Sequence, residues 1–277
     1  MSGWLQALIL GVIQGLTEFL PVSSSGHLVL AQAWFGDAFL FHENAVAFDL
    51  VLHLGTLIPV VVFYRRSILA LARSPFTIDD VPGTPWIRQP DRWLLLMVIV
   101  ASVPTGIMGI AFKDLFERVF HDVTTVATAL FITGIILFTT RLARKREGGT
   151  IVSIPVALAI GVAQGFAITP GISRSGTTIA VALLLGLNRD LAARFSFLLS
   201  IPAILGGLLL VMKDGVSFPT ELLGSLAVGF LSAMVVGYMA LVALVALVRL
   251  GGLHRFSFYL WPLAILGWLS QGIIGSS

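Results

Sequence analysis

The sequence contains no cysteine and few charged residues. Charged side chains make up 11% of the 277 residues and hydrophobic ones 57%, whereas a soluble domain is about a quarter charged. The absence of cysteine excludes disulfides, iron–sulfur clusters and thiolate metal sites. The low charge and high hydrophobicity exclude an ordinary soluble enzyme and a disordered chain. A net charge of only +3, without a basic patch interleaved with aromatics, speaks against nucleic acid as a partner.

What the sequence does have is a series of apolar runs, which predict an all-α integral membrane protein. A helix needs about 20 mostly apolar residues to cross a bilayer. Two runs, 28–35 and 177–187, are too short to cross, and each follows a break rich in Ser and Gly. A helix, a polar break and a half-length helix are typical of a re-entrant hairpin, which is tolerated at membrane depth only where it is buried or lines a wet cavity. The other runs cover residues 3–20, 45–64, 93–112, 123–140, 152–169, 191–212, 221–248 and 256–275.

The chain also repeats itself at an offset of 150 residues. GVIQG at 11–15 matches GVAQG at 161–165, and SSSG at 23–26 matches SRSG at 173–176. Chance similarity between two glycine-rich apolar helices explains the glycines. It does not explain the glutamine and the serine motif in the same register, so we interpret the match as an internal duplication.

The duplication predicts an inverted-topology repeat within a single membrane domain. The first half, residues 1–140, and the second half, residues 151–277, would each contain one re-entrant hairpin followed by three transmembrane helices. The hairpins are expected at about 1–35 and about 152–187. A hairpin returns to its own side of the membrane and three spans do not, so the second half must be inverted. Such repeats place their binding site near mid-membrane, at the repeat interface.

The distribution of Lys and Arg predicts the orientation. If the loop 65–92 is cytoplasmic, so are 141–149, 188–194 and 249–255, and together these loops hold thirteen of the 17 Lys and Arg residues. The opposite side holds three. The positive-inside rule then places both termini and the site outside, in a multi-pass protein of the cell membrane.

A few polar residues fall at membrane depth, where burial is expensive and marks function. Glu18 is the deepest acid, and Arg174 is the one basic residue that this topology places away from an aqueous loop. Gln14 and Glu18 are four residues apart and share a helix face. One carboxylate and one amide oxygen can hold a hard divalent cation such as Mg²⁺ or Ca²⁺. For Gln14 the alternative is a plain hydrogen bond to a neighbouring helix.

Each serine-rich break precedes a helix, and helix N-termini offer free N–H groups and a positive dipole end to phosphate. Arg174 adds a bidentate fork that suits phosphate oxygens. Any single serine here can instead be a plain N-cap. The expected substrate-binding residues are Ser23, Ser25, Gly26, Ser173, Ser175, Gly176 and Thr177.

Two histidines lie near these segments. His27 adjoins the serine run and can act as acid, base or nucleophile near neutral pH. Asp49 and His53 form another i, i+4 pair on one helix face. Asp49 can orient His53 or line the site, and a local ion pair near the outer interface is the slightly preferred alternative.

The motifs resemble those of the undecaprenyl-diphosphate phosphatase, or bacitracin-resistance, family. Q-x-x-x-E at 14–18, followed by FLPVSSSGH at 19–27, resembles the family's (E/Q)-x-x-x-E and P-V-S-S-[ST]-G-H signature. PGISRSG at 170–176 resembles its P-G-x-S-R-S-G signature, and FSFLL at 195–199 extends the likeness. The resemblance implies a membrane phosphatase that removes the terminal phosphate from an isoprenyl diphosphate carrier, with a divalent metal, at the outer membrane face. The resemblance further implies that this activity recycles the carrier for cell-wall synthesis and confers bacitracin resistance.

The resemblance also implies residue roles. Glu18 and Gln14 match the family's acidic pair, Ser24 its functional serine, His27 its essential histidine and Arg174 its phosphate-binding arginine. Many members have Glu in place of Gln14, which places more of any metal or base role on Glu18. The expected catalytic residues are Glu18, Ser24, His27 and Arg174, and the expected metal ligands are Glu18 and Gln14. Ser24 or a water would attack, and His27 or Glu18 would carry the proton.

The expected partners are a lipid diphosphate, whose tail stays in the bilayer, and the surrounding membrane lipids. Because inverted repeats are typical of secondary transporters, a transporter or flippase for a lipid phosphate or another anion is the alternative. Phosphate release by purified protein without a gradient separates the two functions. A homodimer is left open, since small residues occur throughout the sequence.

Overall fold

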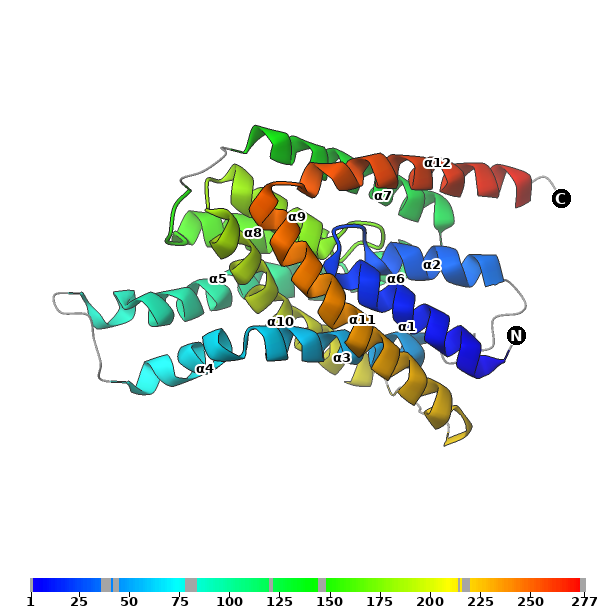
Figure 1. Ribbon diagram of the computed structural model, residues 1–277, viewed down its shortest axis with the longest axis horizontal. Coiled ribbons are helices and arrows are strands. Elements are labelled where there is room, and N and C mark those ends of the chain that lie inside the picture. Colours follow the sequence, from blue (N-terminus) through cyan, green and yellow to red (C-terminus); the bar gives the residue numbers. More distant parts are fainter. Residues whose placement is uncertain are drawn as a thin grey trace.

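The computed structural model describes residues 2–35, 41, 45–77, 84–119, 122–143, 148–213, 215 and 220–274. Regular structure in these residues is helical, apart from one isolated bridge between Gly149 and Leu187. The first described helix begins, and the last one ends, toward the same end of the bundle (Figure 1). The α-helices are α1 Gly3–Phe19, α2 Ser24–Phe35, α3 Ala45–Phe63, α4 Arg65–Arg73, α5 Pro90–Ala111, α6 Lys113–Val119, α7 Val123–Thr139, α8 Ile154–Phe166, α9 Arg174–Leu184, α10 Arg189–Lys213, α11 Leu223–Leu250 and α12 Ser257–Ile274. The 3-10 helices are η3 Ser74–Phe76, η4 Trp86–Arg88, η5 Thr140–Leu142, η6 Thr220–Leu222 and η7 Leu253–Phe256.

Five of the described helical segments are long and apolar enough to cross a membrane: Ala45–Phe63, Pro90–Ala111, Val123–Leu142, Arg189–Lys213 and Thr220–Leu250. The sixth predicted span forms α12. Apolar side chains also cover outward faces, as on α5, where Ile99, Val103, Ile107 and Ile110 are between 54% and 68% exposed. Such faces fit contact with lipid and not with water. The prediction of an all-α, multi-pass membrane protein is confirmed.

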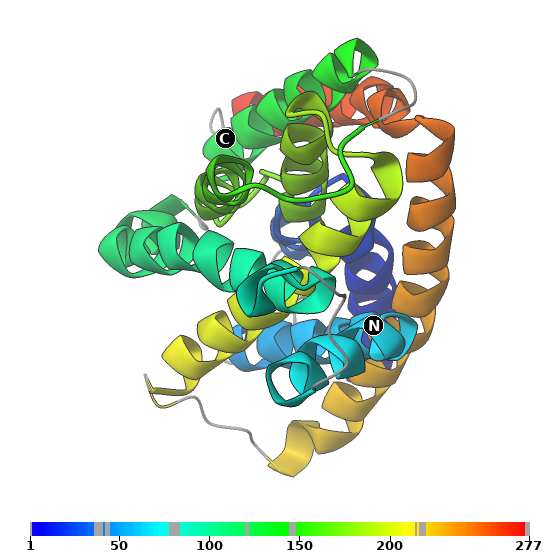
Figure 2. The same cartoon turned by 90° about the vertical axis from the view of Figure 1, so that its left-hand side faces the viewer.

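The two half-length runs form helices, each of which follows an interruption of helical structure. α1 ends at Phe19 and α2 begins at Ser24, while α8 ends at Phe166 and α9 begins at Arg174. With 12 residues in α2 and 11 in α9, neither helix reaches the roughly 30 Å of a bilayer core at about 1.5 Å per residue. Viewed along the bundle, α7 and α12 pair on one side, and α5 and α11 lie on opposite flanks (Figure 2). The two breaks meet between these helices.

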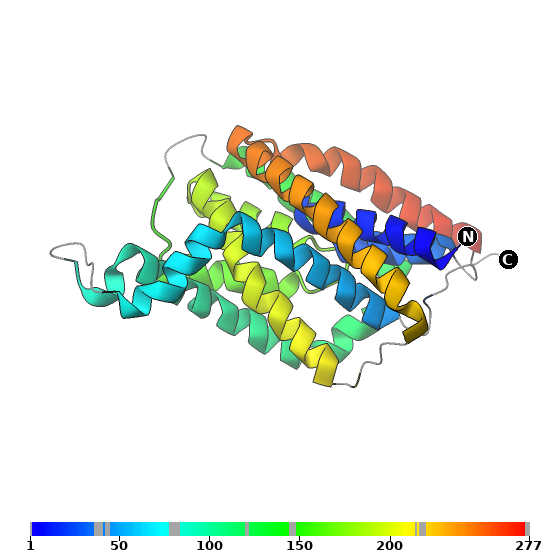
Figure 3. The ribbon, with the colours of Figure 1, turned by 60° about the horizontal axis from the view of Figure 1, so that its bottom comes forward.

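Each broken segment packs against a long helix of the other half of the chain. α1 lies along α11, which also crosses α3 (Figure 3), and α8 lies along α5. Glycines of the repeated motif make these contacts close. A Cβ on Gly15 would lie 2.8 Å from the Ala233 carbonyl oxygen, and one on Gly165 would overlap Met108. Glycine is needed here because the helices approach more closely than a side chain allows.

The segment after α3 differs from the prediction. The sequence predicts a loop over 65–92, but α3 bends at Tyr64 and continues as α4. The apolar face of α4, with buried Leu71, packs toward α5. Because α4 has arginines at both ends, its sequence resembles that of a polar loop. Arg92 is buried behind it, donating hydrogen bonds to the carbonyl oxygens of Ser74 at 2.6 Å and Trp86 at 3.2 Å. Residues 65–77 and 84–92 are therefore a packed part of the fold, and the remainder of the predicted loop lies outside the described residues.

Candidate active site

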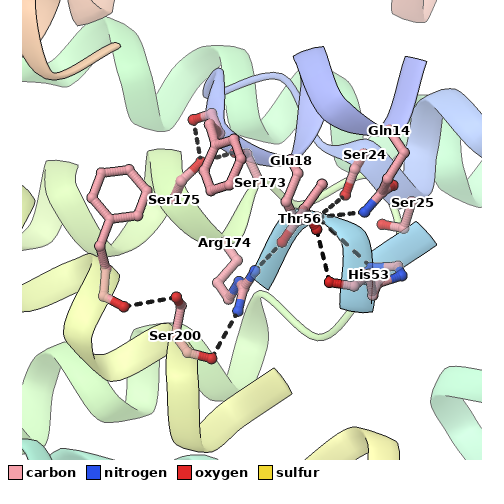
Figure 4. A network of polar contacts seen from close by, with 12 residues as sticks. Gln14, Glu18, Ser24, Ser25, His53, Thr56, Ser173, Arg174, Ser175 and Ser200 are labelled. Atoms are coloured by element: carbon pink, nitrogen blue, oxygen red, sulfur yellow. Dashed lines mark hydrogen bonds and ion pairs between the residues drawn. The ribbon is translucent and has the colours of Figure 1, made fainter. Parts of the chain in front are cut away.

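Glu18, near the end of α1, is the centre of a polar cluster at the meeting point of the two breaks (Figure 4). Its side chain is only 4% exposed. Glu18 Oε1 forms an ion pair with Nη2 of Arg174, the first residue of α9. Glu18 Oε2 accepts hydrogen bonds from Ser24 Oγ at 2.6 Å and from Gln14 Nε2 at 3.0 Å. Residues 156 positions apart thus neutralise each other in the interior, as a buried carboxylate requires.

Arg174 faces a cleft on the side of α10. Its side chain is 22% exposed, and Nη1 donates to the Ser200 carbonyl oxygen at 3.4 Å. The cleft is lined by Glu18, Phe19, Arg174, Ser175, Ser196, Phe197 and Ser200. A guanidinium bordered by hydroxyl groups is suited to binding phosphate oxygens.

His53 reaches the same carboxylate from α3, which the sequence did not reveal. Its Nε2 lies 3.7 Å from Glu18 Oε2, and its Nδ1 lies 2.8 Å from the Asp49 carbonyl oxygen. The Asp49 carboxylate instead accepts a hydrogen bond from Gln32 Nε2 at 3.3 Å. The His53 side chain is 34% exposed, so it links the buried cluster to the protein surface. The i, i+4 spacing of Asp49 and His53 was the available signal, but it did not identify the partner of the ring.

The two broken segments also contact each other directly. Ser175 Oγ donates to the Phe19 carbonyl oxygen at 3.0 Å. A Cβ on Gly26 would lie 3.1 Å from Gly171 Cα, and a Cβ on Gly176 would be crowded in the same way. Gly26 and Gly176, which the sequence predicts as substrate-binding, therefore allow one break to pack on the other. Their buried positions serve the assembly of the site.

Ser23 and Ser173 act as N-caps of α2 and α9. Ser23 Oγ accepts from the Gly26 N–H at 3.3 Å, and Ser173 Oγ accepts from the Gly176 N–H at 3.1 Å. Ser23 has a φ of 69°, in the left-handed region that residues other than glycine seldom adopt. Of the two alternatives that the sequence leaves open for these serines, the geometry matches capping.

Two other predicted residues carry buried polar atoms that lack a partner. Gln14 Oε1 and Thr177 Oγ1 make no hydrogen bond within the described part of the chain. Such atoms are rare in folded proteins and indicate a place for a ligand or water. Ser25 is half-buried, with its hydroxyl 3.3 Å from Ser23 Oγ, and lies on the same side of Glu18 as Gln14 and His53 (Figure 4).

His27 points away from the Glu18 cluster. Its Nδ1 lies 2.8 Å from the Ser23 carbonyl oxygen, and its Nε2 lies 2.8 Å from the Tyr259 hydroxyl on α12. The His27 and Tyr259 rings stack with centroids 5.8 Å apart. Because both ring nitrogens are engaged there, this geometry does not offer His27 as the proton carrier for Ser24.

Comparison with known proteins identifies the family. The model for the bacitracin resistance protein BacA matches residues 7–266. The chain belongs to this family. It is 46% identical over 268 residues to an undecaprenyl-diphosphatase of Carboxydothermus hydrogenoformans, with 94% of each chain covered. A protein of the same name from Halothermothrix orenii is 41% identical over 271 residues, covering 97% of this chain and 98% of the relative. One from Methanosphaera stadtmanae is 39% identical over 274 residues, covering 95% and 96%.

Membership in the BacA family bears on the predicted metal, because the resemblance implied one. Among the residues that the structure describes, no group of three or more His, Asp or Glu side chains is placed to hold a metal ion. The Glu18 carboxylate and the unpartnered Gln14 Oε1 nevertheless fit Mg²⁺, which commonly takes one or two protein oxygens and completes its shell with water and substrate phosphate. Every residue of the cluster lies within the family match.

Proposed function

We propose that this protein hydrolyses undecaprenyl diphosphate to undecaprenyl phosphate and inorganic phosphate. Relatives between 39% and 46% identical carry the name undecaprenyl-diphosphatase over nearly their full length. The observation that carries the proposal is the sequence of contacts from Ser24 through Glu18 to Arg174. A hydroxyl bound to a buried carboxylate, beside a guanidinium, provides a nucleophile, a base and an anion-binding group in one place.

The chain's own residues are arranged to receive the diphosphate head group. The isoprenyl tail would remain in the bilayer, while Arg174 and the N–H groups at the start of α9 bind phosphate oxygens. The partly exposed Ser25 and His53 lie on the same side of Glu18 as Gln14. A divalent cation held by Glu18 and Gln14 would shield the negative charge of the diphosphate when bound.

The short hydrogen bond between Ser24 and Glu18 favours Ser24 as the attacking group. Ser24 Oγ attacks the terminal phosphorus and passes its proton to Glu18 Oε2, and the bond to the bridging oxygen breaks. Undecaprenyl phosphate leaves with that oxygen. Water then attacks the phosphoserine, Glu18 returns the proton to Ser24, and inorganic phosphate is released. Catalysis of this kind depends mainly on positioning and electrostatic stabilisation.

We further propose that residues 1–140 and 151–277 are inverted repeats and that α1–α2 and α8–α9 are re-entrant hairpins. Two observations support this: the matched glycines Gly15 and Gly165 both lie in close helix contacts, and each broken segment packs on a long helix of the other half. We also propose, from the distribution of Lys and Arg, that the site and both termini face the outside of the cell membrane.

The test measures phosphate release by purified protein in detergent, from pure undecaprenyl diphosphate and without any gradient. The unaltered protein should release phosphate, and Arg174→Ala and Glu18→Ala should each abolish most of it. Arg249→Ala is the matched control, because Arg249 also pairs with a carboxylate, Asp190, at 2.6 Å, but in an exposed position. No release by the unaltered protein would favour a transporter, and substantial release by both site variants would overturn the site assignment.

A further inference from the structure

The charges at Glu18 balance without a metal ion. One carboxylate faces one guanidinium, that of Arg174, and both carboxylate oxygens are already engaged. His53 Nε2 lies 3.7 Å from Glu18 Oε2, and a histidine side chain is either neutral or positively charged, so it adds no negative charge. Asp49, the acidic residue of α3, accepts a hydrogen bond from Gln32 on a carboxylate oxygen.

A divalent cation entering this arrangement would meet no net negative charge. Hard cations bind tightly where several anionic or carbonyl oxygens gather, whereas the described residues include no cluster of three acids or histidines here. The Arg174 guanidinium also occupies the Glu18 oxygen that a cation would use. The protein without substrate is therefore a poor receptor for the cation.

A diphosphate changes this balance. Its oxygens can compete for the two-pronged Arg174 side chain, which is 22% exposed and borders the cleft. Once Arg174 turns to phosphate, Glu18 Oε1 is released. Gln14, whose Nε2 is bound to the other carboxylate oxygen, Oε2, carries the unpartnered Oε1 on the same amide group. The diphosphate itself adds the negative charge that the protein lacks.

We infer that the Glu18–Arg174 ion pair keeps the divalent cation out until a diphosphate engages Arg174, so that cation and substrate bind together. This inference rests on the proposed function. In the free protein Arg174 binds Glu18 and so competes with the cation. In the complex Arg174 binds the diphosphate instead, which leaves Glu18 for the cation.

The experiment measures Mn²⁺ binding by the loss of the free-ion signal in electron paramagnetic resonance. Full-length protein in detergent is titrated with Mn²⁺ alone and with a non-hydrolysable isoprenyl methylenediphosphonate. Coupling between two ligands is commonly about 5- to 150-fold, and we expect at least about tenfold tighter Mn²⁺ binding with the diphosphonate. Glu18→Gln supplies the background from Mn²⁺ bound to the diphosphonate alone, and methylenediphosphonate without a tail separates the head group from the lipid.

The decisive variant is Arg174→Gln, because the inference predicts a gain. Without diphosphonate it should bind Mn²⁺ several-fold more tightly than the unaltered protein, and the diphosphonate should add little. A misfolded variant would not gain affinity. Arg249→Gln, in which an exposed ion pair is removed, should behave like the unaltered protein.

Equal Mn²⁺ affinity of the unaltered protein with and without diphosphonate would overturn the inference, and this comparison needs no variant. Phosphate release from undecaprenyl diphosphate is measured on the same preparation. Release without coupling would refute the inference and leave the proposed function standing. Absence of release would refute the proposed function.

Discussion

Gly15 offers a test of how tightly the broken segment is held. A Cβ at this position in α1 would lie 2.8 Å from both the Ala233 carbonyl oxygen and the Gly237 nitrogen of α11. Both neighbours are backbone atoms within a helix, so they cannot turn away as a flexible side chain would. Gly15→Ala should therefore force α1 and α11 apart.

The magnitude follows from two opposing terms. Overpacking of a close contact costs about 1–3 kcal/mol, while alanine is preferred over glycine in a helix by about 1 kcal/mol. Gly106 in α5 isolates the second term, because a Cβ there would meet no atom within 4 Å. Gly106→Ala should thus be neutral or stabilising. The two variants, which carry the same chemical change, should differ in free energy of unfolding by about 1–3 kcal/mol.

The assay is equilibrium or thermal unfolding of both variants in the same detergent, alongside the unaltered protein. Phosphate release should also fall in Gly15→Ala, since α1 carries Glu18. Equal stabilities for the two variants would refute the close approach of α1 to α11 and, with it, the account of the repeated glycines.

Other predictions concern charge and positioning. Glu18→Gln and Arg174→Gln should each lower the free energy of unfolding by about 3–5 kcal/mol, because each leaves a buried charge without its partner. The double variant should lose much less than the sum, and strict additivity in a double-mutant cycle would contradict the pairing. Asp122 caps α7 outside the spans, and hydrogen bonds from a threonine hydroxyl and then from N–H groups lower the pKa of its carboxyl. The stability that ionised Asp122 contributes should be present above about pH 4, the pKa of this carboxyl in the unfolded chain. It should be lost as the pH falls through the lower pKa that the carboxyl has in the folded protein. Asp122→Asn should flatten this acid dependence in melting curves, and an unchanged dependence would count against it. His27→Ala should lower kcat about 100-fold with little change in KM, because the ring positions the break before Ser24. Tyr259→Phe should have a smaller effect, and a normal kcat for His27→Ala would exclude the positioning role.

Much of the framework was predictable from the sequence, because the constraints that a membrane places on a chain are visible in composition. The short runs after the serine-rich breaks predicted half-length helices, and α2 and α9 have that length. The cost of burial at membrane depth singled out Glu18 and Arg174 in the sequence, and in the structure the two form an ion pair. Inverted topology, orientation and the catalytic and metal roles stay predictions.

What could not be predicted depends on which helix faces which. His53 joins Glu18 only because α3 packs beside α1, and nothing in the i, i+4 pattern with Asp49 specifies that neighbour. The direction of the His27 ring depends on Tyr259, which is 232 residues away in the sequence. The serines within a break could not be told apart by sequence. In the structure Ser23 and Ser173 cap helices, whereas Ser24 donates a hydrogen bond to the Glu18 carboxylate. Side-chain direction at a break is set by backbone angles that spacing does not encode.

The division of the ion pair between distant parts of the chain has a consequence for biosynthesis. The ribosome delivers Glu18 long before Arg174, so the first broken segment enters the membrane while its counter-charge has not yet been translated. Its final position can be reached only after the second segment has emerged. A truncated product that ends before residue 174 would carry the Glu18 carboxylate without its guanidinium partner.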